Sequence, residues 1–269
     1  MNISMNVPPS RPVVLCLSGH DPSGGAGLQA DIEALLAQGC HAAPTVTALT
    51  VQDTQNVRDF RVLDREWVLA QAQAVIADLP VAAVKLGMLG SVQMVDTVIE
   101  LMQQLPNTPL VCDPVLRAGG GGALGQDDVG FALRERLLPL ALIATPNLPE
   151  ARLLAELPEG TAEQCAARLL PHCRNLLITG GHGDEQEIHN RLYLRDGSQH
   201  VFTCPRLPGG YHGSGCTLAS ALAGRLALGE ALLSAVRSAL DYTWRTLRDA
   251  EQPGKGQYVP RRLPLDFCD

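Results

Sequence analysis

The sequence predicts an α/β fold of three layers, in which a mostly parallel central sheet carries helices on both faces. Short runs of aliphatic and β-branched residues alternate along the chain with longer segments of helical periodicity. The short runs are almost continuously apolar, as expected for strands that are buried on both faces. The 269 residues, of which 46% are hydrophobic and 18% charged, are enough to build a large core.

The elements follow one another in strand–helix order. The apolar runs predict strands at 13–18, 42–50, 82–87, 110–113, 140–145 and 176–180. The segments with helical period predict helices at 25–38, 66–78, 92–104, 127–137, 148–156, 161–173, 214–228 and 230–250. Two later runs, 191–194 and 200–204, flank Asp196-Gly197 and are typical of a hairpin near a sheet edge.

Nothing in the sequence divides the chain into parts. It contains no internal repeat, no low-complexity tract and no linker rich in Pro, Gly or Ser. We therefore expect a single domain over 1–269, with residues 1–12 as a flexible N-terminal segment. The glycine run at 119–122 is short and indicates a mobile loop rather than a domain boundary.

Charge and cysteine usage exclude several classes of function. The net charge is −7 and no long basic run exists, so neither nucleic acid nor an anionic membrane is an expected partner. The eight cysteines include no Cys-x-x-Cys pair, which argues against a zinc ribbon or a thioredoxin-type site. Residues 1–12 lack the apolar core of a signal peptide and no stop-transfer segment follows. We expect a soluble cytoplasmic protein with reduced cysteines.

The loop at 19–31 is the first candidate for a ligand site, because ligands of open parallel sheets bind beyond the carboxyl ends of the strands. Three glycines fall within four residues of this loop, but neither the Gly-x-Gly-x-x-Gly fingerprint nor a P-loop is present. One interpretation is a tight turn followed by a solvated Asp31. The other is a loop whose backbone approaches a ligand closely while Asp31 points its carboxylate into the same cleft.

The segment 209–218 is the second candidate. Gly213, Ser214 and Gly215 stand at a predicted helix start, where unpaired amides and the helix dipole form an anion hole. Cys216 falls in the first turn, where the dipole is expected to lower the pKa of its thiol. The alternative is a glycine-rich turn in which Cys216 only fills the core.

Two further strand ends carry polar groups. Asp113 ends one apolar run, and Asn147 and Glu150 lie three residues apart at a helix start. Oxygen ligands near an anion hole suit Mg²⁺, which proteins hold through waters and substrate phosphates. Separately, Asn147 and Glu150 are also a good N-cap and capping-box pair. Together with the anion hole, the set favours phosphoryl transfer.

Six segments resemble those of the hydroxymethylpyrimidine/phosphomethylpyrimidine kinases of the ribokinase superfamily. They are 19–31 (GHDPSGGAGLQAD), 85–89 (KLGML), 113–115 (DPV), 145–151 (TPNLPEA), 180–182 (GGH) and 212–218 (HGSGCTL), in the family's order and spacing. The resemblance covers about 13–229 and implies a ribokinase-like fold. It also implies ATP-dependent phosphorylation of 4-amino-5-hydroxymethyl-2-methylpyrimidine, and then of its monophosphate, in thiamine biosynthesis or salvage.

The resemblance also assigns site residues. It implies pyrimidine binding by Gly19, Asp31, Gln52 and Met88, with Asp31 and Gln52 reading the amino group and a ring nitrogen. It implies nucleotide and phosphate binding by Asn147, Glu150, Thr179 and Gly181, and Mg²⁺ binding through water or phosphate at Asp113 and Glu150. It places the anion hole and catalytic position at Gly213, Ser214, Gly215 and Cys216, where many superfamily members have an Asp base instead of Cys216. ATP and Mg²⁺ are the implied cofactors, a monovalent cation is allowed, and a homodimer is implied.

The chain departs from the family pattern at three positions. His20 replaces a small hydroxyl residue, and Gly119 and Thr179 stand at usual lysine positions. Candidates to compensate for the missing cations are Lys85, Arg117 and His182. The alternatives are a pyridoxal or pyridoxine kinase, disfavoured by Asp31 with Gln52, and a non-catalytic pyrimidine-binding regulator, disfavoured by Asp113, Glu150 and Cys216.

Overall fold

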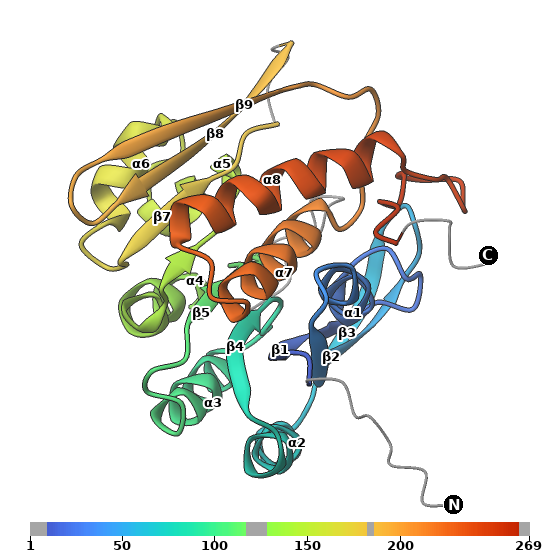
Figure 1. Ribbon diagram of the computed structural model, residues 1–269, viewed down its shortest axis with the longest axis vertical. Helices are drawn as coiled ribbons and strands as arrows, with labels where there is room; N and C mark the ends of the chain where they lie inside the picture. The colour runs from blue at the N-terminus through green and yellow to red at the C-terminus, as the bar shows by residue number, and fades with distance from the viewer. Residues whose placement is uncertain (1–9, 117–127, 182–185, 264–269) are drawn as a thin grey trace, which may run out of the picture.

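A nine-stranded sheet runs through the computed structural model, which describes residues 10–116, 128–181 and 186–263 (Figure 1). The strands are β1 (Val13–His20), β2 (His41–Gln52), β3 (Val57–Val62), β4 (Val81–Leu86), β5 (Leu110–Cys112), β6 (Ile143–Ala144), β7 (Asn175–Ile178), β8 (Glu187–Leu194) and β9 (Gln199–Pro205). The helices are α1 (Gly27–Ala37), α2 (Arg65–Asp78), α3 (Val92–Gln103), α4 (Val129–Ala132), α5 (Leu148–Ala155), α6 (Ala162–Leu169), α7 (Ser214–Ala227) and α8 (Leu232–Arg248).

The order of the strands is β3-β2-β1-β4-β5-β6-β7-β8-β9. From β2 to β7 all pairings are parallel, whereas β3, β8 and β9 pair antiparallel at the two ends of the sheet. The predicted mostly parallel sheet and its edge hairpin are thus confirmed. The sequence did not predict β3, because Arg58, Asp59 and Arg61 are exposed and interrupt any apolar run.

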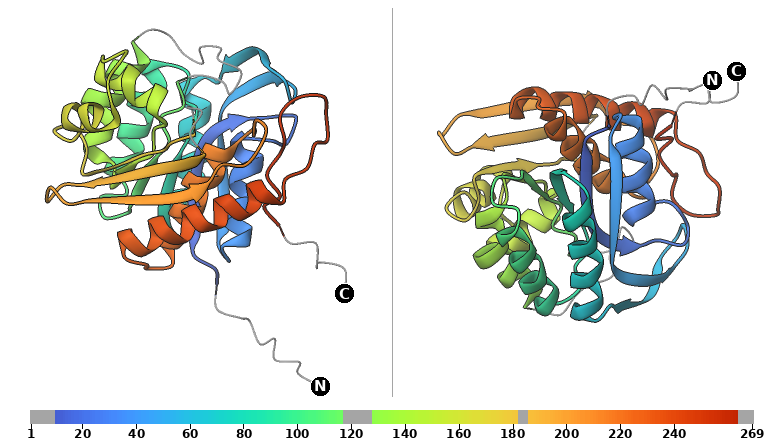
Figure 2. Two further views of the ribbon diagram at one scale, coloured as in Figure 1. Left: turned by 90° about the horizontal axis from the view of Figure 1, so that it is seen from above. Right: turned by 60° about the horizontal axis from the view of Figure 1, so that its bottom comes forward.

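Helices cover both faces of the sheet, which makes the three layers (Figure 2). On one face α1, α7 and α8 pack over β1 and the centre of the sheet in one apolar cluster. On the other face α2, α3, α5 and α6 build a second and larger cluster. Figure 1 shows α7 running beside α8, and α7 also contacts β1, β4 and β5 of the sheet. This position explains why the Ala- and Leu-rich residues from Thr217 to Gly224 are all buried.

Two predicted helices differ from their expected form, and a proline lies close to each difference. The helix expected at 127–137 is α4 continued by a π-helical turn, Leu133–Leu137, and a 3₁₀ turn, Leu138–Leu140, that contains Pro139. These turns leave only Ile143–Ala144 of the strand expected at 140–145. The helix expected at 161–173 ends at Leu169, because Pro171 cannot donate the next helical hydrogen bond. Residues 1–9 of the expected N-terminal segment, the glycine run at 119–122 and residue 127 lie outside the described residues.

Two observations bear on the expected cellular setting. Within the described ranges, no helix has both the length and the apolar character needed to cross a membrane. Cysteines 16, 40, 112, 165, 173, 204 and 216 are free thiols, and the first five are buried.

Candidate active site

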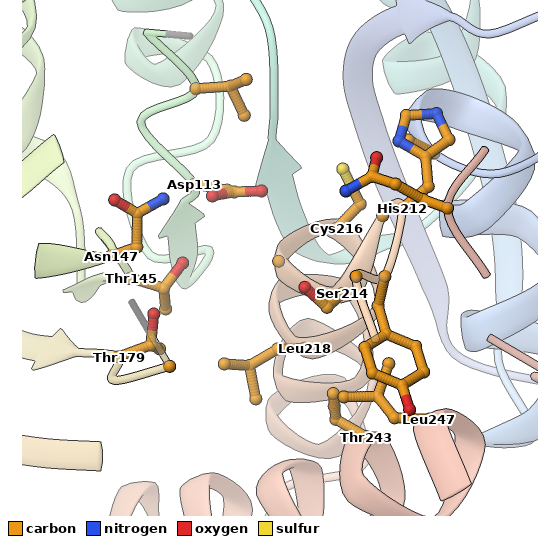
Figure 3. A pocket seen from close by; sticks show the side chains of 18 of the residues that line it. Asp113, Thr145, Asn147, Thr179, His212, Ser214, Cys216, Leu218, Thr243 and Leu247 are labelled. Carbon is orange, nitrogen blue, oxygen red and sulfur yellow. The ribbon is translucent and has the colours of Figure 1, made fainter. Parts of the chain in front are cut away.

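A cavity of about 510 Å³ lies beyond the carboxyl ends of the parallel strands. The ends of β1, β2, β4, β5, β6 and β7 and the start of α7 line it, and Figure 3 shows Asp113, Asn147 and Thr179 across the cavity from Ser214 and Cys216. The predicted residues that line it are Gly19, Gln52, Met88, Asp113, Asn147, Glu150, Thr179, Gly181, Gly213, Ser214, Gly215 and Cys216. Segments almost 200 residues apart in the sequence therefore meet at one site.

The start of α7 forms the expected group of amides. Gly213 is the N-cap residue with φ at +75°, and no side chain in the described part of the chain caps the helix. The first amides of a helix have no partner within it, so the amides from Ser214 onward are available to an anion in the cavity. Gly215 lies next to Asp113, because a Cβ on this glycine would be 3.7 Å from a carboxylate oxygen.

The two glycine-rich loops pack directly against each other. A Cβ on Gly25 would come within 2.2 Å of the His212 ring, and one on Gly213 within 2.0 Å of the Gly25 carbonyl oxygen. A Cβ on Gly27 would meet the Gly19 carbonyl oxygen at 2.3 Å. The sequence suggested that the first loop's glycines bring backbone close to a ligand. Gly25 and Gly27 instead allow protein backbone to approach protein, and that contact joins the two halves of the site.

An Asp–His pair also links these loops. The Asp21 carboxylate lies 2.9 Å from His212 Nε2 and accepts hydrogen bonds from the Ser23 hydroxyl and from the amides of Ser23 and Ala26. Burial opposes ionisation of Asp21, but the bonds from His212 and Ser23 outweigh it and hold its pKa below the ordinary value. Neither residue was predicted to act in the site, although both lie within the motifs that carried the resemblance.

Asp31 is placed differently from the expectation. It does not line the cavity, and its Oδ1 accepts hydrogen bonds of 2.7 Å from Lys85 Nζ and from the Ser220 hydroxyl. Asp31 and Lys85 are fully buried. Burial lowers the pKa of Lys85, but the charge and hydrogen bond of Asp31, together with the effects of Cys216 and Asp113, raise that pKa above the ordinary value. Neither Asp31 nor Lys85 lines the cavity, and substrate contact by Asp31 and compensation by Lys85 for a missing phosphate-binding lysine stay predictions.

The Cys216 thiol lies at the cavity across from Asp113 (Figure 3). Burial raises the pKa of the thiol to about 12, with Lys85 opposing the rise and the negative charges of Asp113 and Asp31 adding to it. The expected lowering of this pKa by the helix dipole is therefore wrong. The dipole is a weaker influence here than burial next to two carboxylates.

We expect Cys216 to be chemically inert at neutral pH. At pH 8 a thiol with this pKa reacts with iodoacetamide on the order of 10³-fold more slowly than free glutathione, because little thiolate is present. Mass spectrometry of tryptic peptides over time measures the rate, with the urea-unfolded protein as the control for intrinsic reactivity. Alkylation of the folded protein as fast as glutathione would contradict the raised pKa.

The capping-box interpretation of Asn147 and Glu150 is confirmed, whereas their binding of phosphate or Mg²⁺ stays a prediction. They form a complete capping box, with bonds of 2.9 and 3.0 Å, and both line the cavity. Burial and the Asp113 charge raise the pKa of Glu150, and burial also raises that of Asp113. Asp113 Oδ2 is buried without a hydrogen-bond partner in the described structure.

These carboxylates fit Mg²⁺ only in part. Across the ranges 10–116, 128–181 and 186–263, no group of three or more His, Cys, Asp or Glu side chains could hold a metal ion. A buried carboxylate oxygen with an unused lone pair nevertheless suits a cation whose other ligands are waters and phosphates.

A cation that was not predicted from the sequence lines the cavity near the end of β7. Thr179 and Gly181 follow β7, and the Arg206 guanidinium donates 3.0 Å to the Gly181 carbonyl oxygen and lines the cavity. Arg117 and His182, the other candidates for compensation, lie outside the described residues. The only sequence signal for Arg206 was its place directly after the predicted hairpin.

Comparison with known proteins agrees with this geometry. Residues 21–261 match the sequence model of a family described as phosphomethylpyrimidine kinase. The chain belongs to this family. The family resemblance found in the sequence, and with it the class of phosphotransferase, is confirmed.

Relatives and solved structures place the kinase more closely. A hydroxymethylpyrimidine/phosphomethylpyrimidine kinase of Streptomyces coelicolor is 42% identical over 87% of this chain and 88% of its own. The crystal structure of a Clostridium difficile phosphomethylpyrimidine kinase matches with a TM-score of 0.75 and 31% identity, over 87% and 98% of the two chains. An ADP complex of Bacillus subtilis pyridoxal kinase matches with a TM-score of 0.86 but 25% identity, over 94% and 98%. The predicted fold class is therefore confirmed.

Proposed function

We propose that this kinase transfers the γ-phosphoryl group of ATP to the hydroxymethyl group of 4-amino-5-hydroxymethyl-2-methylpyrimidine, and then phosphorylates the monophosphate to the diphosphate. The pathway would be thiamine biosynthesis or salvage. The observation that carries the proposal is the cavity that the uncapped amides of Ser214 to Cys216 line together with the ends of β1, β2 and β4. The names of the relatives supply the substrate class.

The pyrimidine end of the cavity is assigned to Gly19, Gln52 and Met88. A Cβ on Gly19 would lie 3.3 Å from the Met88 sulfur, so the glycine keeps this wall thin enough for a flat ring. The Gln52 amide can donate to a ring nitrogen or accept from the amino group. Asp31 holds Lys85 and does not line the cavity.

The nucleotide end is assigned to Asn147, Glu150, Thr179 and Gly181. Nucleotide use is supported by the ADP-bound pyridoxal kinase of the same fold. Mg²⁺, when bound through waters and phosphates at Asp113 and Glu150, would neutralise developing phosphate charge. The family resemblance also allows a monovalent cation as a cofactor.

The reaction needs alignment and charge stabilisation more than covalent participation by the protein. The substrate oxygen forms a bond to the γ-phosphorus, the bond from that phosphorus to the ADP oxygen breaks, and the hydroxyl proton leaves. Amides at the start of α7 stabilise the transferred group, worth about 3–4 kcal/mol for a well-placed donor. The Cys216 thiol stays protonated, so the carboxylate of nearby Asp113 is the better proton acceptor.

An assay of ADP release tests the function. The purified protein, with ATP and MgCl₂, is offered the hydroxymethylpyrimidine, its monophosphate or pyridoxal. We expect turnover of both pyrimidines and a kcat/KM for pyridoxal that is at least tenfold lower. Turnover of neither pyrimidine by folded protein overturns the proposal, and faster turnover of pyridoxal favours the pyridoxal kinase instead.

Gln52→Leu should impair binding of the pyrimidine more than its turnover. Loss of a hydrogen bond to a buried polar group costs about 1–3 kcal/mol, so KM for the pyrimidine should rise by about 10- to 100-fold. KM for ATP should stay within about twofold. The control is Gln55→Leu in the exposed turn after β2, which does not line the cavity. An unchanged KM for the pyrimidine in Gln52→Leu would remove Gln52 from the site.

A homodimer and a cytoplasmic location complete the proposal. Leu49 and Val51 of β2 are exposed apolar residues near one end of the sheet, where a second copy could cover them. Light scattering of the purified protein would distinguish a dimer from a monomer. The free thiols agree with a reducing compartment.

A further inference from the structure

Arg262, which follows the matched family segment, is buried beneath the two glycine loops. Its side chain is fully inaccessible to solvent, and Nη1 lies 3.0 Å from the Glu33 carboxylate on α1. Nη2 donates to the Gly25 carbonyl oxygen and Nη1 makes a longer bond of 3.5 Å to that of Gly24. Three groups of the first loop and α1 are therefore held by one guanidinium.

The same guanidinium reaches the start of α7. Arg262 Nε donates to the Thr217 hydroxyl over 2.9 Å, and this hydroxyl donates to the Gly213 carbonyl oxygen over 2.8 Å. Gly213 is the N-cap of the helix whose amides face the cavity. Arg262 thus joins the loop after β1 to the anion hole through one intervening hydroxyl.

The backbone that carries Arg262 is anchored independently of its side chain. The segment after α8 turns back beside α1 (Figure 1), and Tyr258 exchanges backbone hydrogen bonds of 2.8 and 2.9 Å with His212 and Gly210. The Gln257 amide donates to Thr54 in the turn after β2, and the Arg261 amide to Thr246 of α8. Loss of the Arg262 side chain should therefore leave this segment in place.

From these contacts we infer that Arg262 is a positioning residue, which sets the distance between the pyrimidine-binding loop and the anion hole. The planar guanidinium supplies several donors in fixed directions, which a lysine ammonium on a flexible stem does not reproduce. The inference rests on the proposed kinase activity. A misplacement of about 1 Å between reacting groups can cost about 10²-fold in rate.

The test is the kinetics of Arg262→Gln. We expect kcat for the hydroxymethylpyrimidine to fall at least tenfold, whereas KM for the pyrimidine and for ATP each change by less than about threefold. A merely structural role would lower the melting temperature and the active fraction without this split. Arg261→Gln is the matched control, because Arg261 pairs with the exposed Glu251, and its kcat should stay within twofold.

Thr217 supplies a second line of the same test. Thr217→Val removes the intervening hydroxyl and should lower kcat as Arg262→Gln does, whereas Thr217→Ser should restore it. In the double variant Arg262→Gln/Thr217→Val, kcat should be no lower than in the weaker of the two single variants. Both substitutions break the same chain of hydrogen bonds from Arg262 through Thr217 to Gly213. If Arg262→Gln does not fold, the comparison of kcat between Thr217→Val and Thr217→Ser tests the inference.

Three results would overturn the inference: a kcat of Arg262→Gln within twofold of wild type, losses that multiply in the double variant, or no difference between Thr217→Val and Thr217→Ser. Failure of the proposed function looks different, because the wild-type protein would then turn over neither pyrimidine.

Discussion

Lys85→Met is expected to destabilise the protein by about 3–5 kcal/mol. Lys85 Nζ and Asp31 Oδ1 are 2.7 Å apart, and neither side chain is exposed. Without the lysine, the Asp31 carboxylate keeps only the Ser220 hydroxyl among its described partners. A buried carboxylate without its cationic partner carries its full desolvation cost, so breaking such a pair strongly lowers the free energy of unfolding. Urea unfolding monitored by circular dichroism measures the change.

Two further variants separate the ion pair from the volume of the side chain. Lys85→Met/Asp31→Leu removes both charges, so we expect it to recover most of the lost stability. Lys255→Met is the control, since Lys255 is the only other lysine of the sequence and is exposed. A cost below about 1 kcal/mol for Lys85→Met alone would show that water, rather than Lys85, solvates Asp31.

Gly213→Ala is expected to lower kcat by about 10²-fold or more. The residue has φ at +75°, and the added Cβ would lie 2.0 Å from the Gly25 carbonyl oxygen. The two loops must then separate, which moves the amides of the anion hole away from the transferred phosphoryl group. Loss of one such donor costs about 10²–10³ in kcat in comparable sites. Steady-state kinetics of the purified variant, with its melting temperature, provides the measurement.

The chain offers a control for backbone strain alone. Gly229, at the end of α7, has φ at +84°, and a Cβ there would meet nothing within 4 Å. Gly229→Ala should therefore cost only the strain of a left-handed alanine, about 1–2 kcal/mol, and leave kcat unchanged. Gly25→Ala disrupts the same contact from the opposite loop, where the Cβ would meet His212, and should lose activity as Gly213→Ala does. A kcat of Gly213→Ala within threefold of wild type would contradict the proposed role of the loop contact.

Local signals in the sequence were enough for most of the fold. The parallel strands are nearly continuous apolar runs because both of their faces are covered, and such runs are visible without coordinates. The edge strand β3 carries exposed charges on one side of a sheet and has no such run, so it was missed. Pro139 lies in the 3₁₀ turn before the shortened strand β6, and Pro171 follows the early end of α6. Both prolines are visible in the sequence, but the new bounds of the elements were not predicted from them.

The sequence predicted where the site residues lie better than what each of them does. Motifs at strand ends and at one helix start must meet at one edge of a parallel sheet, and twelve of the thirteen predicted site residues do line the cavity. Asp31 is the exception, because its partner Lys85 lies 54 positions away and only the folded chain brings the two charges together. For the same reason the sequence predicted a lowered pKa for Cys216. The helix dipole is a local feature, whereas burial beside Asp113 and Asp31 is not.

The sequence by itself thus determined the family, the fold class and the segments that form the site, since these depend on local patterns and on their order. Only the tertiary structure decided which charges pair, which thiol stays protonated and which backbone contacts demand glycine. Each of these depends on distances between segments that are remote in the sequence. The pairing of Arg262 with a loop more than 230 positions earlier is the clearest case.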